Sequence, residues 1–103
     1  MTGEWHVYLV RTRRGALYTG IATDVARRLE EHGGKGSRGA KSLRSKGPLE
    51  IAYQARVGTR SLALKIERGV KALSKDQKEE LVATMPSCDD LLDYLGFEEG
   101  VNA

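Results

Sequence analysis

Hydrophobic and polar residues alternate along the first part of the chain. Residues 5–11 run Trp-His-Val-Tyr-Leu-Val-Arg, and residues 16–22 continue the alternation after a short polar segment that ends at Gly15. Alternation over this length is typical of β-strands that bury one face. Because only four or five residues connect the two segments, we expect them to form an antiparallel hairpin.

The register of this hairpin decides which side chains share a face. One face is expected to be buried by four aliphatic side chains: Val7, Leu9, Leu17 and Ile21. If the pairing of the two strands shifted by one residue, the aliphatic side chains of one strand would face solvent. The same register puts Tyr8 and Tyr18 together on the opposite face, near Gly20. Cross-strand packing alone also brings two tyrosines together in this way, so the pair by itself does not establish a site.

A helix is expected to follow the hairpin and to end at about His32. Thr23 or Asp24 can cap its first turn, and the next apolar residues are four apart, as on the buried side of a helix. Arg28 and His32 are also four apart and therefore project from one face.

The second half of the chain is predicted to hold one more strand and three more helices. Residues 49–57 alternate, and their apolar positions are expected on one face of the strand: Leu49, Ile51, Tyr53, Ala55 and Val57. Residues 59–73 have helical periodicity, with Glu67 at the margin of the apolar stripe. Ser74-Lys75-Asp76-Gln77 is a capping box that begins a helix to Thr84, and Ser87 can cap a last helix that ends before Gly96.

This order of elements predicts a small α/β (α+β) fold. A three-stranded, largely antiparallel sheet would be flanked by helices in ββαβα order, with further helices at the C-terminal end. The length of 103 residues suits a single core. We expect one domain over residues 1–86, followed by a short acidic helix and tail over residues 87–103.

The charge distribution is uneven, although the formal net charge is only +3. Residues 1–78 hold all 17 Lys and Arg with 7 of the acids, whereas residues 79–103 hold 7 acids and no Lys or Arg. A basic body suggests a polyanionic partner, although a solvated surface with an acidic end has the same composition. A single cysteine excludes an internal disulfide, and no apolar run could span a bilayer, so we expect a cytoplasmic protein without a membrane partner.

The segment from Gly33 to Gly47 contains five glycines, five basic residues and no acid. Glycine-rich backbone can approach a phosphate closely, and basic side chains add charge, so this segment is a candidate nucleic-acid contact. The basic residues are Lys35, Arg38, Lys41, Arg44 and Lys46. A flexible solvated linker is the alternative interpretation.

Five residues in the chain are of types that suit phosphodiester cleavage: Tyr8, Tyr18, Arg28, His32 and Glu67. The reaction needs a base for water, a cation for the developing phosphorane charge, and usually a metal held by a carboxylate. A lone carboxylate favours Mg²⁺ or Mn²⁺, which keep most of their waters. Sequence spacing alone does not bring the carboxylate to the hairpin.

The chain resembles the GIY-YIG nuclease superfamily, and most closely its small single-domain bacterial branch of the YhbQ type. Val7-Tyr8-Leu9 precedes Tyr18-Thr19-Gly20 by about ten residues, and the block YTGIATDVARRLEEH at 18–32 has the family's spacing. The resemblance covers roughly residues 5–84. It implies a divalent-metal-dependent endonuclease that acts on DNA, with structured or damaged DNA in repair or recombination as the expected substrate and RNA not excluded.

The resemblance also implies a role for each matched residue. Tyr8 would activate or position the attacking water, and Tyr18 would be hydrogen-bonded into the same site. Gly20 would permit close backbone approach. Arg28 would bind the scissile phosphate. His32 would assist proton transfer or orient a tyrosine, and Glu67 would be the metal ligand.

Two departures from the family pattern keep a second interpretation open. The first motif is His6-Val7-Tyr8 rather than Gly-Ile-Tyr, and the late asparagine of many members is missing, since the only asparagine is Asn102. A nucleic-acid-binding module of the same fold with weak or no catalysis is therefore the alternative, followed by an adaptor that docks through its acidic end. We expect a monomer or a weak homodimer.

Overall fold

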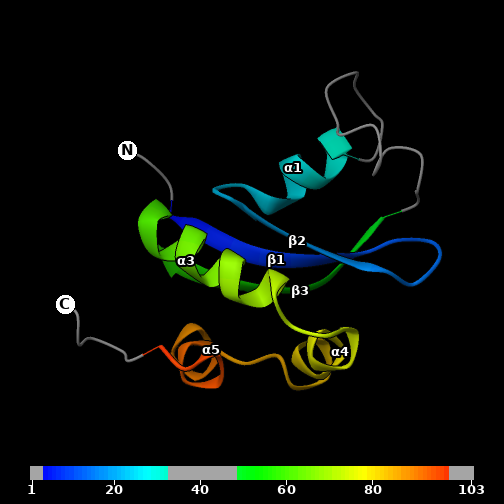
Figure 1. The fold of residues 1–103 in the computed structure, drawn as a ribbon. Helices are drawn as coiled ribbons and strands as arrows, with labels where there is room; N and C mark the ends of the chain where they lie inside the picture. Colours follow the sequence, from blue (N-terminus) through cyan, green and yellow to red (C-terminus); the bar gives the residue numbers. More distant parts are fainter. Residues whose placement is uncertain (1–3, 33–48, 98–103) are drawn as a thin grey trace.

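The sheet is built around strand β1 (Trp5–Arg11), which has a neighbour on each side (Figure 1). It pairs antiparallel with β2 (Leu17–Ala22) on one side and with β3 (Glu50–Gly58) on the other, so the strand order is β2-β1-β3. The structure is a computed structural model that describes residues 4–32 and 49–97. The predicted three-stranded antiparallel sheet is confirmed.

Helices cover both faces of this sheet (Figure 1). Helix α1 (Val25–His32) packs on one face, and α3 (Arg60–Lys71) packs on the other. Helices α4 (Lys75–Thr84) and α5 (Cys88–Leu95) extend the α3 side. The fold is therefore α+β, as predicted. None of the helices in the described parts of the chain has the length and hydropathy needed to cross a bilayer.

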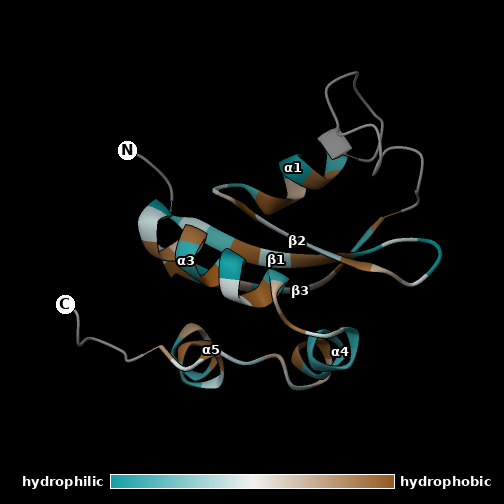
Figure 2. Ribbon diagram, viewed as in Figure 1, coloured by the Kyte–Doolittle hydropathy of each residue, from teal (hydrophilic) through white to brown (hydrophobic). Residues whose placement is uncertain are grey.

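Two hydrophobic clusters, one on each face of the sheet, hold the elements together, and hydrophobic residues run along most of β1 between them (Figure 2). The larger cluster contains Val7, Leu9, Leu17, Tyr53, Ala55, Ile66, Val70, Leu81, Leu91 and Leu92. The smaller cluster lies under α1 and contains Tyr8, Val10, Ala22 and Val25. The central strand is therefore buried on both faces, which explains its run of four buried residues.

The hairpin has the register that the sequence predicts. Val7 pairs with Ile21, and Arg11 pairs with Leu17, so the predicted aliphatic set shares the face toward α3. Tyr8 pairs with Gly20, and Val10 pairs with Tyr18. The two tyrosines therefore share a face as diagonal neighbours rather than directly opposite each other.

The prediction that all apolar positions of the third strand share one face is wrong. The register between β1 and β3 shifts between Leu9 and Val10, whose partners are Tyr53 and Ile51. The extra residue, Ala52, forms a bulge that moves the earlier part of the strand to the other face. As a result Leu49 and Ile51 pack with the cluster under α1, whereas Tyr53 packs in the larger cluster.

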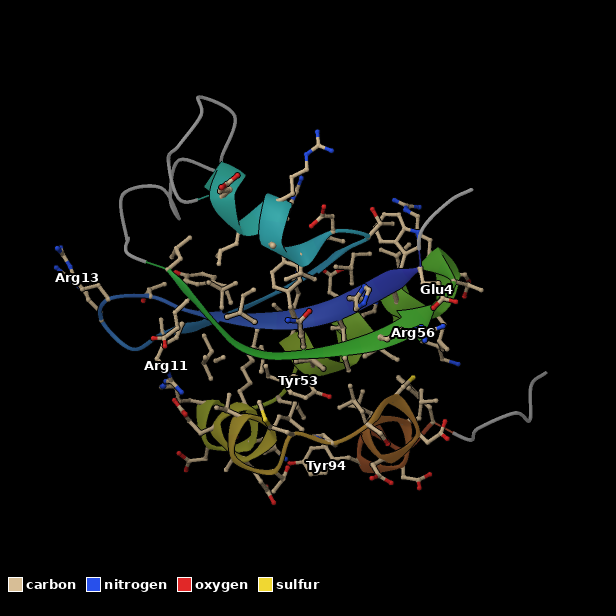
Figure 3. All side chains as sticks on the ribbon, turned by 180° about the vertical axis from the view of Figure 1, so that it is seen from behind. Glu4, Arg11, Arg13, Tyr53, Arg56 and Tyr94 are labelled. Carbon is tan, nitrogen blue, oxygen red and sulfur yellow. The ribbon has the colours of Figure 1, made fainter. Side chains whose placement is uncertain are left out.

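Side-chain caps set the helix boundaries close to the predicted ones. Thr59 Oγ1 accepts a hydrogen bond from the Leu62 amide, and Ser74 and Gln77 form the predicted capping box. Tyr53 anchors the connection between α4 and α5, since its hydroxyl donates to the Pro86 carbonyl oxygen at 2.6 Å (Figure 3). Burial raises the pKa of Tyr53 to about 12, so this donor keeps its proton throughout the neutral range.

Candidate active site

Tyr8 is the buried centre of the candidate site. Its side chain lies under α1 with 5% of its surface exposed, and its ring crosses the backbone of Gly20 on the neighbouring strand. A Cβ atom at residue 20 would lie 2.5 Å from Tyr8 Oη and 2.6 Å from Tyr8 Cζ. The absence of a side chain at Gly20 therefore leaves room for the Tyr8 phenol. The close approach that this glycine permits is between the Tyr8 side chain and the backbone of residue 20.

Arg28 on α1 brings a positive charge to this phenol. Burial raises the pKa of Tyr8, while the charge of Arg28 and a hydrogen bond between the two side chains lower it. The net shift is upward, so the hydroxyl carries its proton at neutral pH. Arg28 is exposed, whereas the Tyr8 phenol on which its charge acts is buried.

Glu67 approaches the same phenol from helix α3. Helix α3 packs against both strands of the hairpin, and the Glu67 carboxylate raises the pKa of Tyr8 electrostatically. The Glu67 side chain is 18% exposed, and its Oε2 lies 3.6 Å from Nζ of Lys71 on the next helical turn. Ile66 and Val70 fix the orientation of α3 by inserting into the larger cluster, so Glu67 is held at the rim of that contact.

The other two motif residues lie on β2 and at the end of α1. Tyr18 lies on the Tyr8 face of β2 with 36% of its surface exposed. His32 is the last residue of α1, and its side chain lies outside the described residues. The structure thus brings Tyr8, Gly20, Arg28 and Glu67 into one neighbourhood, with Tyr18 diagonal to Tyr8.

The predicted basic contact falls outside the described residues. Its five cations, all within residues 33–48, are Lys35, Arg38, Lys41, Arg44 and Lys46. Asn102 also lies outside the described residues. These residues remain sequence-based predictions.

The donor set suits a metal ion that needs few protein ligands. Among residues 4–32 and 49–97, no group of three or more His, Cys, Asp or Glu side chains is arranged to hold a metal. One partly exposed carboxylate, Glu67, fits Mg²⁺ or Mn²⁺, which retain several waters and accept phosphate oxygens as further ligands.

One part of this region was not predicted from the sequence. A cleft of about 480 Å³ lies beside Arg28, between the start of β1 and the starts of α1 and α3, and Trp5, Arg27 and Arg60 line it. Trp5 and Arg60 are 55 positions apart, and no spacing rule connects a strand start with a helix start at that separation. The single tryptophan of the chain was the one available signal, because a large aromatic at a strand end often lies at a surface site.

The candidate site residues lie in a segment of the chain that matches a known family. Residues 4–80 match the family described as the GIY-YIG catalytic domain. The match includes Tyr8, Tyr18, Gly20, Arg28 and Glu67.

Individual proteins and a solved structure are also similar to this chain over most of its length. UPF0213 protein YE0453 of Yersinia enterocolitica is 57% identical over 83 residues, covering 81% of this chain and 84% of that protein. UPF0213 protein YhbQ of Salmonella arizonae is 53% identical over 91 residues, covering 88% and 89%. The solution NMR structure of UPF0213 protein BH0048 from Bacillus halodurans is 32% identical, with a TM-score of 0.52 over 92% of this chain and 99% of that one.

Proposed function

The chain belongs to the GIY-YIG catalytic domain family, and on that premise we propose that it is an endonuclease that hydrolyses phosphodiester bonds in DNA with the help of Mg²⁺ or Mn²⁺. The observation that supports this proposal is the packing of two helices around the hairpin: α1, which carries Arg28, covers Tyr8, and α3, which carries Glu67, packs against both hairpin strands from the other face. The reaction needs a carboxylate that can bind a metal ion, a cation that can bind a phosphate, and a hydroxyl that can hydrogen-bond to the attacking water.

Each group has a distinct task in this hydrolysis. Water oxygen adds to phosphorus, one P–O ester bond breaks, and the products are a phosphomonoester and a hydroxyl. Glu67 would hold the divalent ion, which when bound neutralises phosphate charge and polarises the ester. Arg28 binds the scissile phosphate and stabilises the charge that develops on its oxygens.

The tyrosines act as neutral hydrogen-bonding groups. Since the pKa of Tyr8 is raised above its ordinary value, its hydroxyl keeps its proton at neutral pH and orients the attacking water rather than deprotonating it as a phenolate. Tyr18 completes this hydrogen bonding from the neighbouring strand. His32, at the last position of α1, would assist proton transfer or orient a tyrosine.

Two observations favour a second candidate function, a binding module of the same fold with weak catalysis. Lys71 lies 3.6 Å from the Glu67 carboxylate and competes with a metal ion for it. The chain also has no asparagine other than Asn102 to fill the late position of the family pattern. A binder would still use the basic segment to contact phosphates.

Cleavage assays separate the two functions. Purified protein is incubated with branched and linear DNA and with Mg²⁺ or Mn²⁺, beside Glu67→Gln and Arg28→Ala. We expect metal-dependent nicking, faster on branched DNA, that falls by about 100-fold or more in both variants. Glu80→Gln and Arg68→Ala change the same charges elsewhere on the helices and should cleave normally. DNA binding without cleavage at any metal concentration would instead establish the binding module.

A further inference from the structure

The cleft beside Arg28 combines charge with apolar walls. It is formed by the first residue of β1, the end of β2, and the first turns of α1 and α3. Three arginines, Arg27, Arg28 and Arg60, line it, against one acidic residue, Asp24. Its volume of about 480 Å³ is within the usual range for small-ligand sites. A positively charged cleft of this size suits an anionic ligand.

Trp5 and Arg60 give the cleft a flat, polarisable wall. The Arg60 guanidinium carbon lies 5.6 Å from the centroid of the Trp5 ring, within the range of a cation–π contact. Indole faces and guanidinium planes are the surfaces on which nucleobases stack, and such stacking tolerates any base. Ile21 and Leu64 add apolar side chains to this lining.

The cleft is continuous with the candidate active site through Arg28. This residue lines the cleft, and the helix that carries it packs over Tyr8. A strand whose scissile phosphate meets Arg28 therefore has its neighbouring nucleotide at the cleft. The guanidinium of Arg27 suits the phosphate of that nucleotide, and the wall formed by Trp5 and Arg60 suits its base.

We propose that this cleft binds one nucleotide of the substrate, adjacent to the phosphodiester that is cut, with its base stacked against Trp5 and Arg60. The inference rests on the proposed nuclease function, and it adds a substrate requirement. A base that stacks in the cleft has left its own duplex stack, so the enzyme engages an unpaired or splayed nucleotide next to the cut. Branch points, frayed ends and single strands offer such nucleotides.

The single tryptophan makes the test direct, because stacking changes indole fluorescence and Trp5 is the only source of that signal. Glu67→Gln protein without divalent metal is titrated with a short single-stranded deoxyoligonucleotide that carries a terminal fluorophore. DNA binding is followed by fluorophore anisotropy, and stacking is followed by Trp5 emission. We expect saturable quenching that coincides with binding. An oligonucleotide with an abasic site at the stacked position should bind about 5- to 150-fold more weakly and quench less.

Variants assign the effect to the wall of the cleft. Arg60→Ala should weaken binding of the intact oligonucleotide toward that of the abasic one, whereas Arg68→Ala, on the same helix outside the cleft, should not. In the active protein Trp5→Ala should raise KM for the intact strand and leave the abasic strand unchanged, and Trp5→Phe should restore part of the loss. Circular dichroism checks that each variant is folded.

The outcomes separate this inference from the nuclease proposal. Binding by anisotropy without a change in Trp5 emission, or equal binding of intact and abasic strands at every position, overturns the nucleotide subsite even if the protein cleaves DNA. The absence of any binding overturns it as well. Quenching and base-dependent binding in a wild-type protein that never cleaves leave the subsite established and reject the nuclease.

Discussion

Residue 20 of the hairpin has no room for a side chain, because a Cβ atom there would lie only 2.5 Å from the Tyr8 hydroxyl oxygen. The ring is rigid and 5% exposed, so it cannot swing away without disturbing the cluster under α1. We therefore predict that Gly20→Ala displaces the Tyr8 hydroxyl, lowers cleavage by at least about 10-fold and destabilises the fold by about 1–3 kcal/mol. Cleavage rates and denaturant unfolding measure the two effects.

A double variant provides the control for this steric argument. Tyr8→Ala removes the clashing ring, at the usual cost of a buried aromatic. If the clash is real, Gly20→Ala should be much less destabilising in the Tyr8→Ala background than in the wild type. Additive losses of stability would show that Gly20 is required for another reason.

The pair of Tyr8 and Arg28 makes a prediction about protonation. Burial raises the pKa of Tyr8, and Arg28 offsets part of that rise through its charge and hydrogen bond. Replacing Arg28 by Gln should therefore raise the pKa of Tyr8 further, as followed by NMR with ¹³C-labelled tyrosine. Arg27→Gln, which removes the same charge one residue earlier, is the control and should shift it less. Equal shifts in the two variants would contradict a direct contact between Arg28 and Tyr8.

Among the elements, helix α4 is attached to the hairpin by one ionic cluster. The Glu79 carboxylate accepts two hydrogen bonds from Arg11, at 2.8 and 2.9 Å, and a third from Nζ of Lys75 at 2.5 Å. Arg11 projects toward α4 from the end of β1 (Figure 3). The hydrogen bonds from Arg11 and then those from Lys75 lower the pKa of Glu79 to about 2.

This lowered pKa predicts how stability depends on pH. The unfolded carboxyl titrates near 4.5, so the contribution of Glu79 is complete above that pH and disappears as the pH falls toward about 2. Glu79→Gln should therefore be less stable than the wild type at pH 7, and the difference should vanish between pH 4.5 and 2 in urea unfolding. Glu80→Gln is the control at the adjacent position. A difference that persists at pH 2 would mean that Glu79 acts by packing and not by charge.

Local patterns predicted most of the elements because the forces that set them act locally. The capping box at Ser74 and the alternation around Val7 need only neighbouring residues, and both are confirmed. The bulge at Ala52 was not predictable in this way, since it depends on which strand β3 pairs with. Leu49 and Ile51 alternate regularly with Tyr53 in sequence, yet they pack on the other face.

The candidate site shows the same division between local and long-range information. The hairpin register put Tyr8 and Tyr18 on one face from alternation alone. The approach of Glu67 depends on how α3 packs against the sheet, and only the family resemblance anticipated it. The cleft at Trp5 and Arg60 was missed because it requires two elements that begin at the same end of the sheet but are far apart in the chain.

At the scale of the whole molecule, the acidic C-terminal part also contributes to the hydrophobic core. Leu91 on α5 has no exposed surface, and Leu92 has 7%. Both pack in the larger cluster beneath the sheet, so removal of residues 87–103 would expose apolar surface as well as remove charge. The effect of the acids on nucleic-acid binding therefore has to be tested by substitution and not by truncation.

Neutralising the acids of α5 provides that test. Asp89, Asp90 and Asp93 are exposed, and their charges oppose a polyanion that approaches the basic body. We predict that replacing all three by Asn tightens DNA binding by about 2- to 10-fold at low salt. The gain should disappear at about 0.5 M salt, where charges more than a few ångströms apart are screened. Losing the two acids of the first helical turn costs some stability, about 0.3–1 kcal/mol each, so thermal unfolding is measured in parallel. If a folded variant binds DNA at low salt as the wild type does, the three acids do not oppose DNA binding and serve only to keep α5 solvated.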